Sequence, residues 1–441
     1  MPQLLDPNTD VSTLPSFMSR SAVEQRINQL LQYMSRPDSA LSTRRRLREL
    51  SSLLATYPDA IHYAVANRAI QTVIRLNQRS EELMVRQHSN QVLALLGYCE
   101  PPKGNGIRIL SIDGGGTRGI LVIEILRELE RLSGKPVHEM FDLICGVSTG
   151  AIIGMLLGAM RTPIDECEEY YHRFSSHLFK SDFLRGAGRL IWSHAYYDTT
   201  VWEKILKDIY GETLMMESKQ CAGTPSVLAI SALMNKPSIE AFLFRNYELP
   251  IHTRSLSQYE GSSKYKIWQA VRASAAAPGY FEEIRLDQYV HQDGGLLINN
   301  PTAVAVHEAK MLWPSEHIQC VLSLGSGRFV PQLEEPPSRT TSLKTKIIKL
   351  IDSATDTEMV DRLMKDLLPP KTYFRINPYL TEMGTLDENR REKLDQMKAD
   401  ARKYLRKNDN KFTEAVTELT QKRKVRQHLE DWLRLQYYLR V

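Results

Sequence analysis

Apolar runs that lead directly into glycine-rich turns constrain the fold of this chain most strongly. The runs and their turns are Ile107–Ile112 before Asp113-Gly-Gly-Gly-Thr-Arg-Gly119, and Asp142–Val147 leading into Gly146-Val-Ser-Thr-Gly150. Apolar residues at helical spacing follow each turn, over Ile120–Leu132 and Thr149–Met160. A strand, a tight turn and a helix in succession are typical of βα units, whose strands pair in parallel.

Further apolar runs extend the same pattern. Ser226–Ala232, Ala241–Phe244 and Gln319–Leu324 are predicted strands. Their alternation with helical stretches predicts an α/β fold with a mostly parallel central sheet and helices on both faces.

The flanking regions have a different character. Residues 1–100 show helical spacing without strands, so we predict a helical N-terminal region, for which an armadillo- or HEAT-like stack is one interpretation. Pro101–Gly106 has the composition of a linker. We therefore divide the chain into the helical region 1–100, an α/β domain 107–330 and a helical C-terminal extension 331–441.

The last predicted helix runs from about Thr413 to Tyr438. It carries Leu429, Trp432 and Leu433 at helical spacing and is rich in Lys and Arg. This pattern favours a helix that packs on the rest of the chain over one that contacts a membrane.

Composition favours a soluble chain in a reducing compartment. Hydrophobic residues make up 42% and charged residues 25% of the sequence, which are ordinary values for a chain with a packed core. The five cysteines are irregularly spaced and form no CxxC pair, which argues against a disulfide framework or a zinc site. A net charge of +5 suits an anionic membrane surface as well as nucleic acid, so charge alone predicts neither partner.

Leu143–Met160 is a charge-free stretch long enough to be weighed as a membrane span. The cluster of Gly146, Ser148, Thr149 and Gly150 falls inside it. A turn at that place favours a buried strand followed by a buried helix over a continuous span.

The first turn contains Gly114-x-Gly116-x-x-Gly119, which on its own fits a dinucleotide-binding loop. Such a loop needs an acidic residue at the end of the next strand, where this chain has Gly-Val-Ser-Thr-Gly instead, and no Gly-Lys-Ser/Thr follows the glycines. The same backbone suits an oxyanion hole, because glycines allow close approach and N–H groups at a helix start favour negative charge. Each such donor contributes about 3 kcal/mol to a transition state.

The second turn matches the nucleophile elbow G-x-S-x-G. Gly146 and Gly150 flank Ser148 and permit the sharp strand-to-helix turn that exposes its hydroxyl. The strand before the motif and the helix after it supply the required context. Ser148 is therefore the candidate nucleophile.

A serine nucleophile needs a base. His291 stands two residues before Asp293, and neither it nor His194 and His307 sits in a recognisable catalytic context. Asp293, followed by Gly294, Gly295 and an apolar run, is the better candidate. A carboxylate is a weak base, with a usual pKa of about 4, but it can work within hydrogen-bond reach when desolvated.

These motifs together resemble the patatin-like phospholipases, in particular their calcium-independent phospholipase A2 branch. The resemblance rests on four stretches: SIDGGGTRG (111–119), CGVSTGAI (145–152), WQAVRASAAAPGYF (268–281) and HQDGGLLINNP (291–301). It implies a three-layer α/β/α domain with a Ser148–Asp293 dyad. It also implies an oxyanion hole within Gly114, Gly115, Gly116, Thr117, Arg118 and Gly119.

The resemblance further implies a phospholipid substrate, release of fatty acid and lysophospholipid, and no cofactor or metal. The sequence contains no D-x-D-x-D-G calcium loop, which agrees with calcium independence. We expect an intracellular enzyme in peripheral contact with internal membranes, those of the endoplasmic reticulum, mitochondria or peroxisomes, and no nucleic-acid partner. The oligomeric state is left open.

Two alternatives remain. The same dyad would serve an esterase that prefers neutral lipids or lysophospholipids. In the second alternative, the chain is a helical scaffold protein with an inactive lipase domain. The intact Ser148, Asp293 and glycine loop argue against this alternative.

Overall fold

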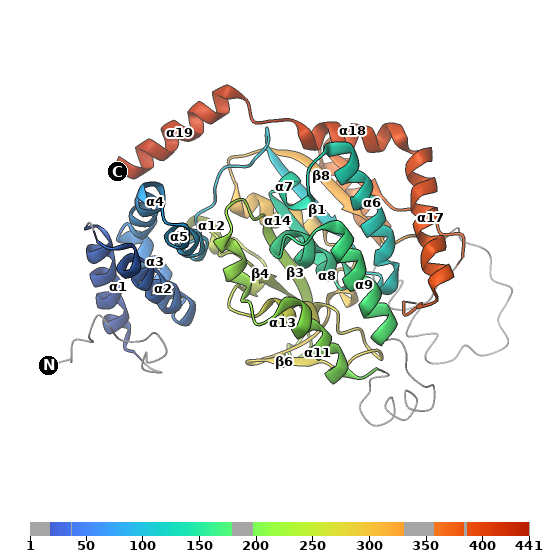
Figure 1. Ribbon diagram of the computed structural model, residues 1–441, viewed down its shortest axis with the longest axis horizontal. Helices are drawn as coiled ribbons and strands as arrows, with labels where there is room; N and C mark the ends of the chain where they lie inside the picture. Colours follow the sequence, from blue (N-terminus) through green and yellow to red (C-terminus); the bar gives the residue numbers. More distant parts are fainter. Residues whose placement is uncertain (1–17, 37, 179–196, 330–356, 383–385, 441) are drawn as a thin grey trace.

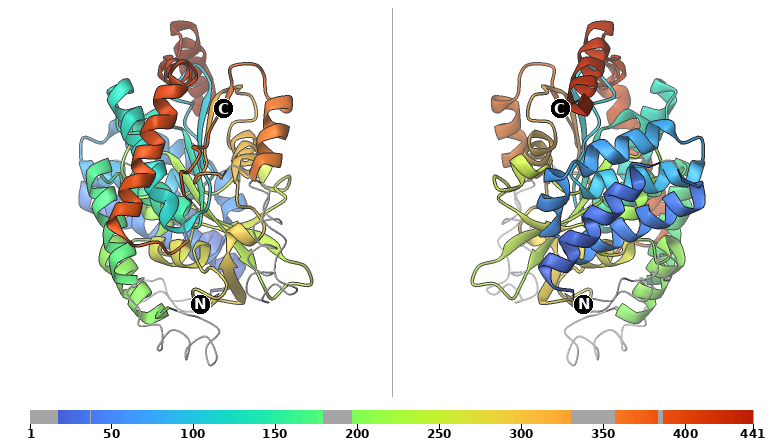
Figure 2. Two further views of the ribbon diagram at one scale, coloured as in Figure 1. Left: turned by 90° about the vertical axis from the view of Figure 1, so that its right-hand side faces the viewer. Right: turned by 90° about the vertical axis from the view of Figure 1, so that its left-hand side faces the viewer.

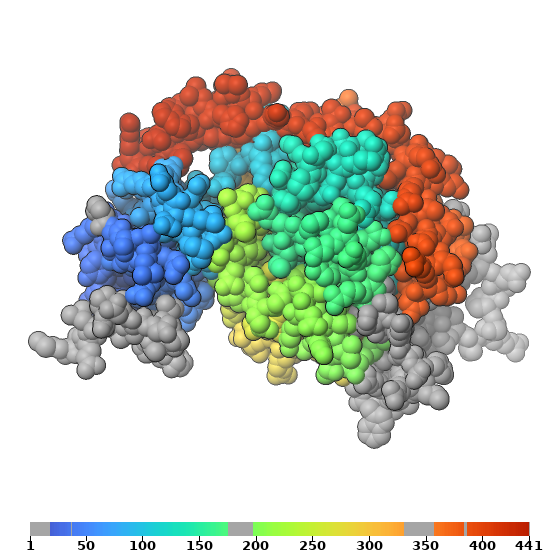
Figure 3. Space-filling view, viewed as in Figure 1, coloured from blue at the N-terminus to red at the C-terminus, as the bar shows by residue number. Residues whose placement is uncertain are grey.

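The computed structural model describes residues 18–36, 38–178, 197–329, 357–382 and 386–440. A central β-sheet runs through the larger part of the molecule, with helices on both sides and the N-terminal helices grouped beside it (Figure 1). The C-terminal helices form an arc around the sheet that ends next to the N-terminal group (Figures 1 and 3).

The sheet of the described residues is nine-stranded and has the order β5-β4-β3-β2-β1-β8-β9, with β7 paired to β3 and β6 to β7. Its strands are β1 (Ile107–Ile112), β2 (Leu143–Val147), β3 (Ser226–Leu233), β4 (Glu240–Arg245), β5 (Glu260–Ser262), β6 (Ile284–Leu286), β7 (Tyr289–Asp293), β8 (Ile318–Leu324) and β9 (Tyr373–Ile376). The core strands β3, β2, β1, β8 and β9 pair in parallel, while β4 and β7 run antiparallel to β3. The predicted α/β class with a mostly parallel sheet is confirmed.

Helices cover both faces because successive strand residues point to opposite sides. Leu110 and Ile144 face one apolar cluster, and Ile109 and Leu143 face another. The first cluster involves α6 (Gly119–Ser133), α8 (Thr149–Gly154), α9 (Ile164–Leu178), α11 (Thr199–Tyr210), α13 (Ile267–Ser274), α17 (Arg391–Lys407) and α18 (Asp409–Thr420). The second involves α14 (Thr302–Leu312) and α16 (Thr357–Leu367), so the sheet is the middle of three layers (Figure 2).

The N-terminal helices share a core of their own. They are α1 (Arg20–Met34), α2 (Ala40–Thr56), α3 (Ala60–Ala66), α4 (Ala69–Arg79) and α5 (Leu83–Leu95). Leu30, Leu50 and Val73 are among the buried residues that form this core. The helices differ in length from 7 to 17 residues, and their relation to armadillo or HEAT repeats stays a prediction.

Strand β9 lies beyond residue 330 and pairs with β8, from Val321–Tyr373 to Leu324–Ile376. The prediction of a purely helical C-terminal extension did not include this strand. The strand is only four residues long, so it lacks the length that makes a strand visible in a sequence. The division of the chain at residues 100, 107 and 330 stays a proposal.

The C-terminal helix predicted over Thr413–Tyr438 is two helices, α18 and α19 (Val425–Arg440), separated by a segment in which Lys422 forms a β-bridge with Gly104. Buried Arg423 fixes this break with ion pairs to Glu316 and Asp431. Helix α19 packs on the rest of the chain, as predicted, but Leu429, Trp432 and Leu433 are 52–56% exposed and do not form that contact. Leu439 instead packs on the core of the N-terminal helices.

The charge-free stretch Leu143–Met160 forms β2, α8 and a π-helical turn over Met155–Ala159, and nearly all of it is buried. The prediction of a buried strand and helix is confirmed. In the described parts of the chain, no helix combines the length and apolar character needed to cross a membrane.

Candidate active site

Ser148 occupies the turn between β2 and α8 with a strained backbone. Its φ of 54° and ψ of −121° are unusual for a residue with a side chain. The turn depends on glycine, because a Cβ on Gly146 would lie 2.2 Å from the carbonyl oxygen of Gly150, and one on Gly150 2.3 Å from that of Ile112. This strained strand-to-helix geometry is that of a nucleophile elbow.

Asp293, at the end of β7, is the hydrogen-bond partner of the Ser148 hydroxyl. Ser148 Oγ donates a hydrogen bond to Asp293 Oδ2 at 2.7 Å, and the Gly295 N–H donates to Asp293 Oδ1 at 2.7 Å. A Cβ on Gly294 would meet the carbonyl oxygen of Ile230 at 2.3 Å, so glycine lets β7 turn tightly over β3. The structure thus brings together the predicted nucleophile and base.

Burial makes Asp293 a better base than an exposed carboxylate. Its side chain is 5% exposed, and burial raises its pKa to about 6, against the opposing effect of the hydrogen bonds from Ser148 and Gly295. A base is most effective when its pKa lies near the working pH. Asp293 is therefore ionised at neutral pH and still able to take a proton.

The histidines weighed as alternatives have other surroundings. His291 is fully buried, with Nδ1 2.9 Å from Ser231 Oγ and its ring against Phe242 and Phe244. Burial lowers the pKa of His291 to about 4, so it is neutral. His307 packs against Tyr259, and His194 lies outside the described residues.

The glycine loop follows β1 and opens α6. Gly114 N–H donates to the carbonyl oxygen of Asn299, and Thr117 N–H donates to that of Leu386. The Arg118 and Gly119 N–H groups bond back to carbonyls within the loop. These residues of the predicted oxyanion set are therefore already engaged.

The Gly115 and Gly116 N–H groups are different. None of the hydrogen bonds formed by the described residues uses them. Gly116 has φ of 58°, and a Cβ there would lie 2.1 Å from the carbonyl oxygen of Leu386, so only glycine fits. Two unused backbone donors in the turn between β1 and α6 make Gly115 and Gly116 the candidates for an oxyanion hole within the predicted set.

Several residues that build this site were not predicted. Ser274 Oγ accepts the Ser148 N–H at 2.9 Å and donates to the carbonyl oxygen of Ile230, which pins the elbow to β3. Ser326 Oγ donates to the carbonyl oxygen of Gly114. Such contacts have no local sequence signal, since each joins a common residue to a distant backbone atom.

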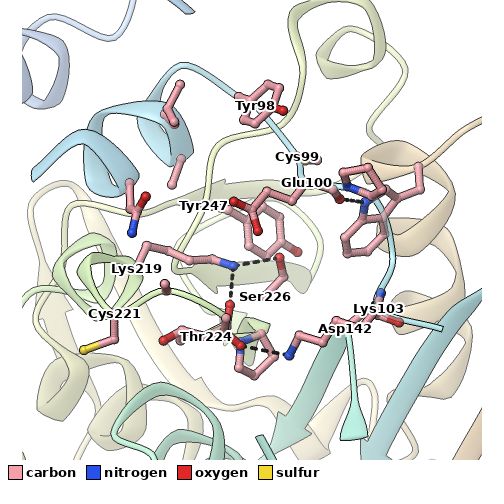
Figure 4. A pocket seen from close by; sticks show the side chains of 18 residues that line it. Tyr98, Cys99, Glu100, Lys103, Asp142, Lys219, Cys221, Thr224, Ser226 and Tyr247 are labelled. Carbon is pink, nitrogen blue, oxygen red and sulfur yellow. Dashed lines mark hydrogen bonds between the residues drawn. The ribbon is translucent and has the colours of Figure 1, made fainter. Parts of the chain in front are cut away.

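The described residues also contain a pocket of about 100 Å³ that does not include the dyad. It lies between α5 and the amino ends of β2 and β3 (Figure 4). Its lysines are already bonded: Lys103 Nζ to the carbonyls of His138, Phe141 and Gly223, and Lys219 Nζ to Thr224 and Ser226. We take Ser148 as the candidate active site because its hydroxyl is hydrogen-bonded there to Asp293, the candidate base.

No group of three or more His, Cys, Asp or Glu side chains suited to a metal ion occurs in the described part of the chain.

Comparison with known proteins gives a consistent result. The family model described as patatin-like phospholipase matches residues 110–306, a range that holds the glycine loop, Ser148 and Asp293. The chain is 44% identical over 420 residues to the calcium-independent phospholipase A2-gamma of Oryctolagus cuniculus and that of Homo sapiens, covering 95% of this chain and 53% of each relative. It is 31% identical over 401 residues to Phospholipase A I of Arabidopsis thaliana, covering 78% of this chain and 30% of that protein.

The chain thus spans about half the length of the gamma-type relatives that it matches. The matched segment carries the elbow, the Asp-Gly-Gly turn and the glycine loop in one layered domain. The resemblance found in the sequence is confirmed, and residues 110–306 of the chain form a domain of the patatin-like phospholipase family.

Proposed function

We propose that this chain is a calcium-independent phospholipase that hydrolyses fatty-acyl ester bonds of membrane phospholipids through Ser148 and Asp293. The observation that carries the proposal is the 2.7 Å hydrogen bond from Ser148 Oγ to buried Asp293 Oδ2. The names of the similar proteins, which are phospholipases, support the choice of substrate.

In the first half of the reaction, Ser148 Oγ attacks the ester carbonyl carbon while Asp293 Oδ2 takes the hydroxyl proton. Negative charge moves to the carbonyl oxygen, which the N–H groups of Gly115 and Gly116 stabilise. The intermediate collapses with cleavage of the C–O bond, and the proton passes from Asp293 to the departing lysophospholipid oxygen. An acyl-Ser148 ester remains.

In the second half, Asp293 takes a proton from water, and the resulting nucleophile attacks the acyl-Ser148 carbonyl. The same backbone donors stabilise the second oxyanion. Ser148 leaves as its oxygen recovers a proton from Asp293, and a fatty acid is released. One water molecule is consumed for each ester bond cleaved.

The proposed calcium independence follows from the fact that protein groups carry out every step. The nucleophile, the base and the oxyanion donors are all groups of this chain, so no step calls for a metal ion or an organic cofactor. The gamma-type relatives are named calcium-independent phospholipases, which agrees with this proposal.

Access to phospholipid requires contact with a membrane surface, which we propose to be peripheral and on internal membranes. The C-terminal helix α19 offers a surface that anchors the chain to a membrane, separate from the dyad. Its exposed apolar residues are spaced for a single helix face: Val425, Leu429, Trp432, Leu433 and Tyr437. Exposed Lys422 and Lys424 lie just before the helix, so the surface is complementary to anionic lipid headgroups.

The decisive experiment is product analysis by mass spectrometry, with the wild type beside Ser148→Ala. Phosphatidylcholine, lysophosphatidylcholine and triacylglycerol are offered separately. Fatty acid and lysophospholipid from phosphatidylcholine, absent in the variant, support the proposal. Faster hydrolysis of triacylglycerol or lysophosphatidylcholine would favour the esterase alternative. Absence of both hydrolysis and fluorophosphonate labelling in the wild type would favour an inactive scaffold.

A further inference from the structure

The glycine loop is held from outside the segment that matches the family model. Residues 110–306 contain the loop itself. Ser326 Oγ bonds to the carbonyl oxygen of Gly114 at 2.7 Å, and the carbonyl oxygen of Leu386 accepts the Thr117 N–H at 2.8 Å. Both groups come from later parts of the chain, so the oxyanion donors depend on C-terminal residues for their position.

The strongest of these links joins Asp113 and Arg375. Asp113 is the residue at which β1 becomes the glycine loop, and Arg375 lies on β9. Arg375 Nη1 donates to Asp113 Oδ1 at 2.9 Å and Nη2 to Oδ2 at 2.6 Å. Two parallel hydrogen bonds between a planar guanidinium and a carboxylate fix orientation as well as distance.

Both members of this pair are shielded from water. Asp113 is 1% exposed and Arg375 is 4% exposed. Burial raises the pKa of Asp113 to about 6, while the guanidinium of Arg375 opposes that rise. A carboxylate in this position without its partner would be an uncompensated buried charge, which is strongly unfavourable.

The remaining contacts of Arg375 orient it toward the loop. Its Nη1 also donates to Ser323 Oγ on β8 at 3.0 Å, and Glu358 on α16 lies 3.7 Å from Nη2. Asp113 N–H donates to the carbonyl oxygen of Leu324, which places the start of the loop on the same strand. The loop is therefore anchored by its backbone to β8 and by its first side chain to β9.

We propose that Arg375 is a positioning residue for the hydrolase reaction, which through Asp113 holds the N–H groups of Gly115 and Gly116 in line with the oxyanion. This inference rests on the proposed function. The unused donors stand two and three residues after Asp113, so a rotation at Asp113 redirects both. Arg375 touches no reacting atom and acts only by fixing the loop.

The test compares Arg375→Met with a matched variant, Arg245→Met. Arg245 forms an equally buried, two-pronged pair with Glu308, at 2.7 and 2.8 Å, and touches neither the dyad nor the glycine loop. Removal of either arginine leaves one buried carboxylate without its cation, and Glu308 then keeps only the hydrogen bond from the Tyr247 hydroxyl, at 2.9 Å. A general loss of stability should thus be similar in the two variants, and only a positioning role separates them.

For Arg375→Met we expect kcat for a soluble short-chain ester to fall roughly 100-fold, the scale of losing one oxyanion donor. KM should change less than about threefold, because the loss concerns the transition state and not substrate binding. Arg245→Met should keep kcat per folded molecule, with the folded fraction measured by circular dichroism. Fluorophosphonate labelling should slow in parallel with kcat.

Arg375→Lys keeps the charge and loses the two-pronged geometry, and we expect its kcat to fall about tenfold with the fold retained. If Arg375→Met does not fold, this variant decides the matter. A kcat within about threefold of wild type in Arg375→Lys would then overturn the inference, as would equal kcat losses in Arg375→Met and Arg245→Met. Hydrolysis that survives Ser148→Ala would overturn the proposed function itself, whereas Ser148-dependent hydrolysis that survives Arg375→Met overturns this inference alone.

Discussion

Ser148 and Asp293 are 145 positions apart in the chain, and the sheet brings their side chains to 2.7 Å. Ser148 follows β2 and Asp293 ends β7, and both strands pair with β3. Strand β3 therefore sets the distance between nucleophile and base. Side chains placed at the ends of strands that share a partner strand are held more rigidly than side chains on loops.

Ser148→Ala should lose nearly all hydrolysis, on the order of 10⁴-fold or more, because no other group forms the acyl-enzyme. Asp293→Asn should be comparably damaging, and the double variant should be little worse than either single change, since the two act as a unit. Rates of phosphatidylcholine hydrolysis per folded molecule check this. A Ser148→Ala rate within about tenfold of wild type would remove Ser148 from the nucleophile role.

Acylation should depend on pH through Asp293. Because burial raises its pKa to about 6, the carboxylate form that accepts a proton predominates above that pH and is lost below it. The rate of fluorophosphonate labelling should rise between about pH 5 and pH 7 and then level off. The residual labelling of Asp293→Asn should lack this inflection. If the inflection persists there, it belongs to another group, such as Asp113.

His291→Ala should cost much less than a change to either member of the dyad. The ring lies against Phe242 and Phe244 and contacts Ser231, so its loss leaves a cavity and lowers the free energy of unfolding without touching Ser148. We expect a lower Tm and a kcat within about tenfold of wild type. Abolished acylation in His291→Ala alongside an active Asp293→Asn would replace the dyad with a histidine-based mechanism.

The site residues that could be predicted from the sequence are those whose position depends on adjacent residues in the chain. Ser148 and Asp293 were identified because a tight turn needs glycines beside the functional residue, and Gly146, Gly150 and Gly294 each pack against backbone. That requirement leaves a mark in consecutive residues.

The site residues that the sequence did not reveal act on partners that are distant in the chain. Ser274 supports the elbow from 126 positions away, and Arg375 holds Asp113 from 262 positions away. Neither residue has neighbours that disclose its partner. The break between α18 and α19 is likewise set by ion pairs of Arg423 with Glu316 and Asp431, against a helical pattern that continues in the sequence.

Chelation should leave the enzyme active. Ser148, Asp293 and the Gly115 and Gly116 N–H groups supply the nucleophile, base and oxyanion donors, so hydrolysis of a soluble short-chain ester should be unchanged in excess EDTA or EGTA. The same assay after dialysis serves as its control. Loss of soluble-ester activity on chelation, restored by calcium, would reopen the mechanism.

Membrane binding and catalysis should be separable through α19. Lys422 pairs with Gly104, just before the amino end of β1, whereas Ser148 follows the carboxyl end of the parallel strand β2. The segment just before α19 therefore lies at the amino edge of these parallel strands, opposite the edge at which Ser148 stands. Charge reversal of Lys422 and Lys424 should weaken binding to anionic vesicles and leave soluble-ester hydrolysis unchanged.

Vesicle binding by the wild type should also weaken as the salt concentration rises, because attraction between exposed charges is screened within about 10 Å at 0.1 M ionic strength.

Trp432→Ala tests the apolar half of the same surface. Trp432 is 55% exposed, so the change should reduce vesicle binding without lowering Tm. Arg423 is left unchanged in this test because it is buried and forms ion pairs with Glu316 and Asp431. Reversal of its charge would disrupt the segment between α18 and α19. Cosedimentation with vesicles of phosphatidylcholine and phosphatidylserine measures the binding. Unchanged cosedimentation in both variants would mean that the exposed face of α19 does not contact lipid.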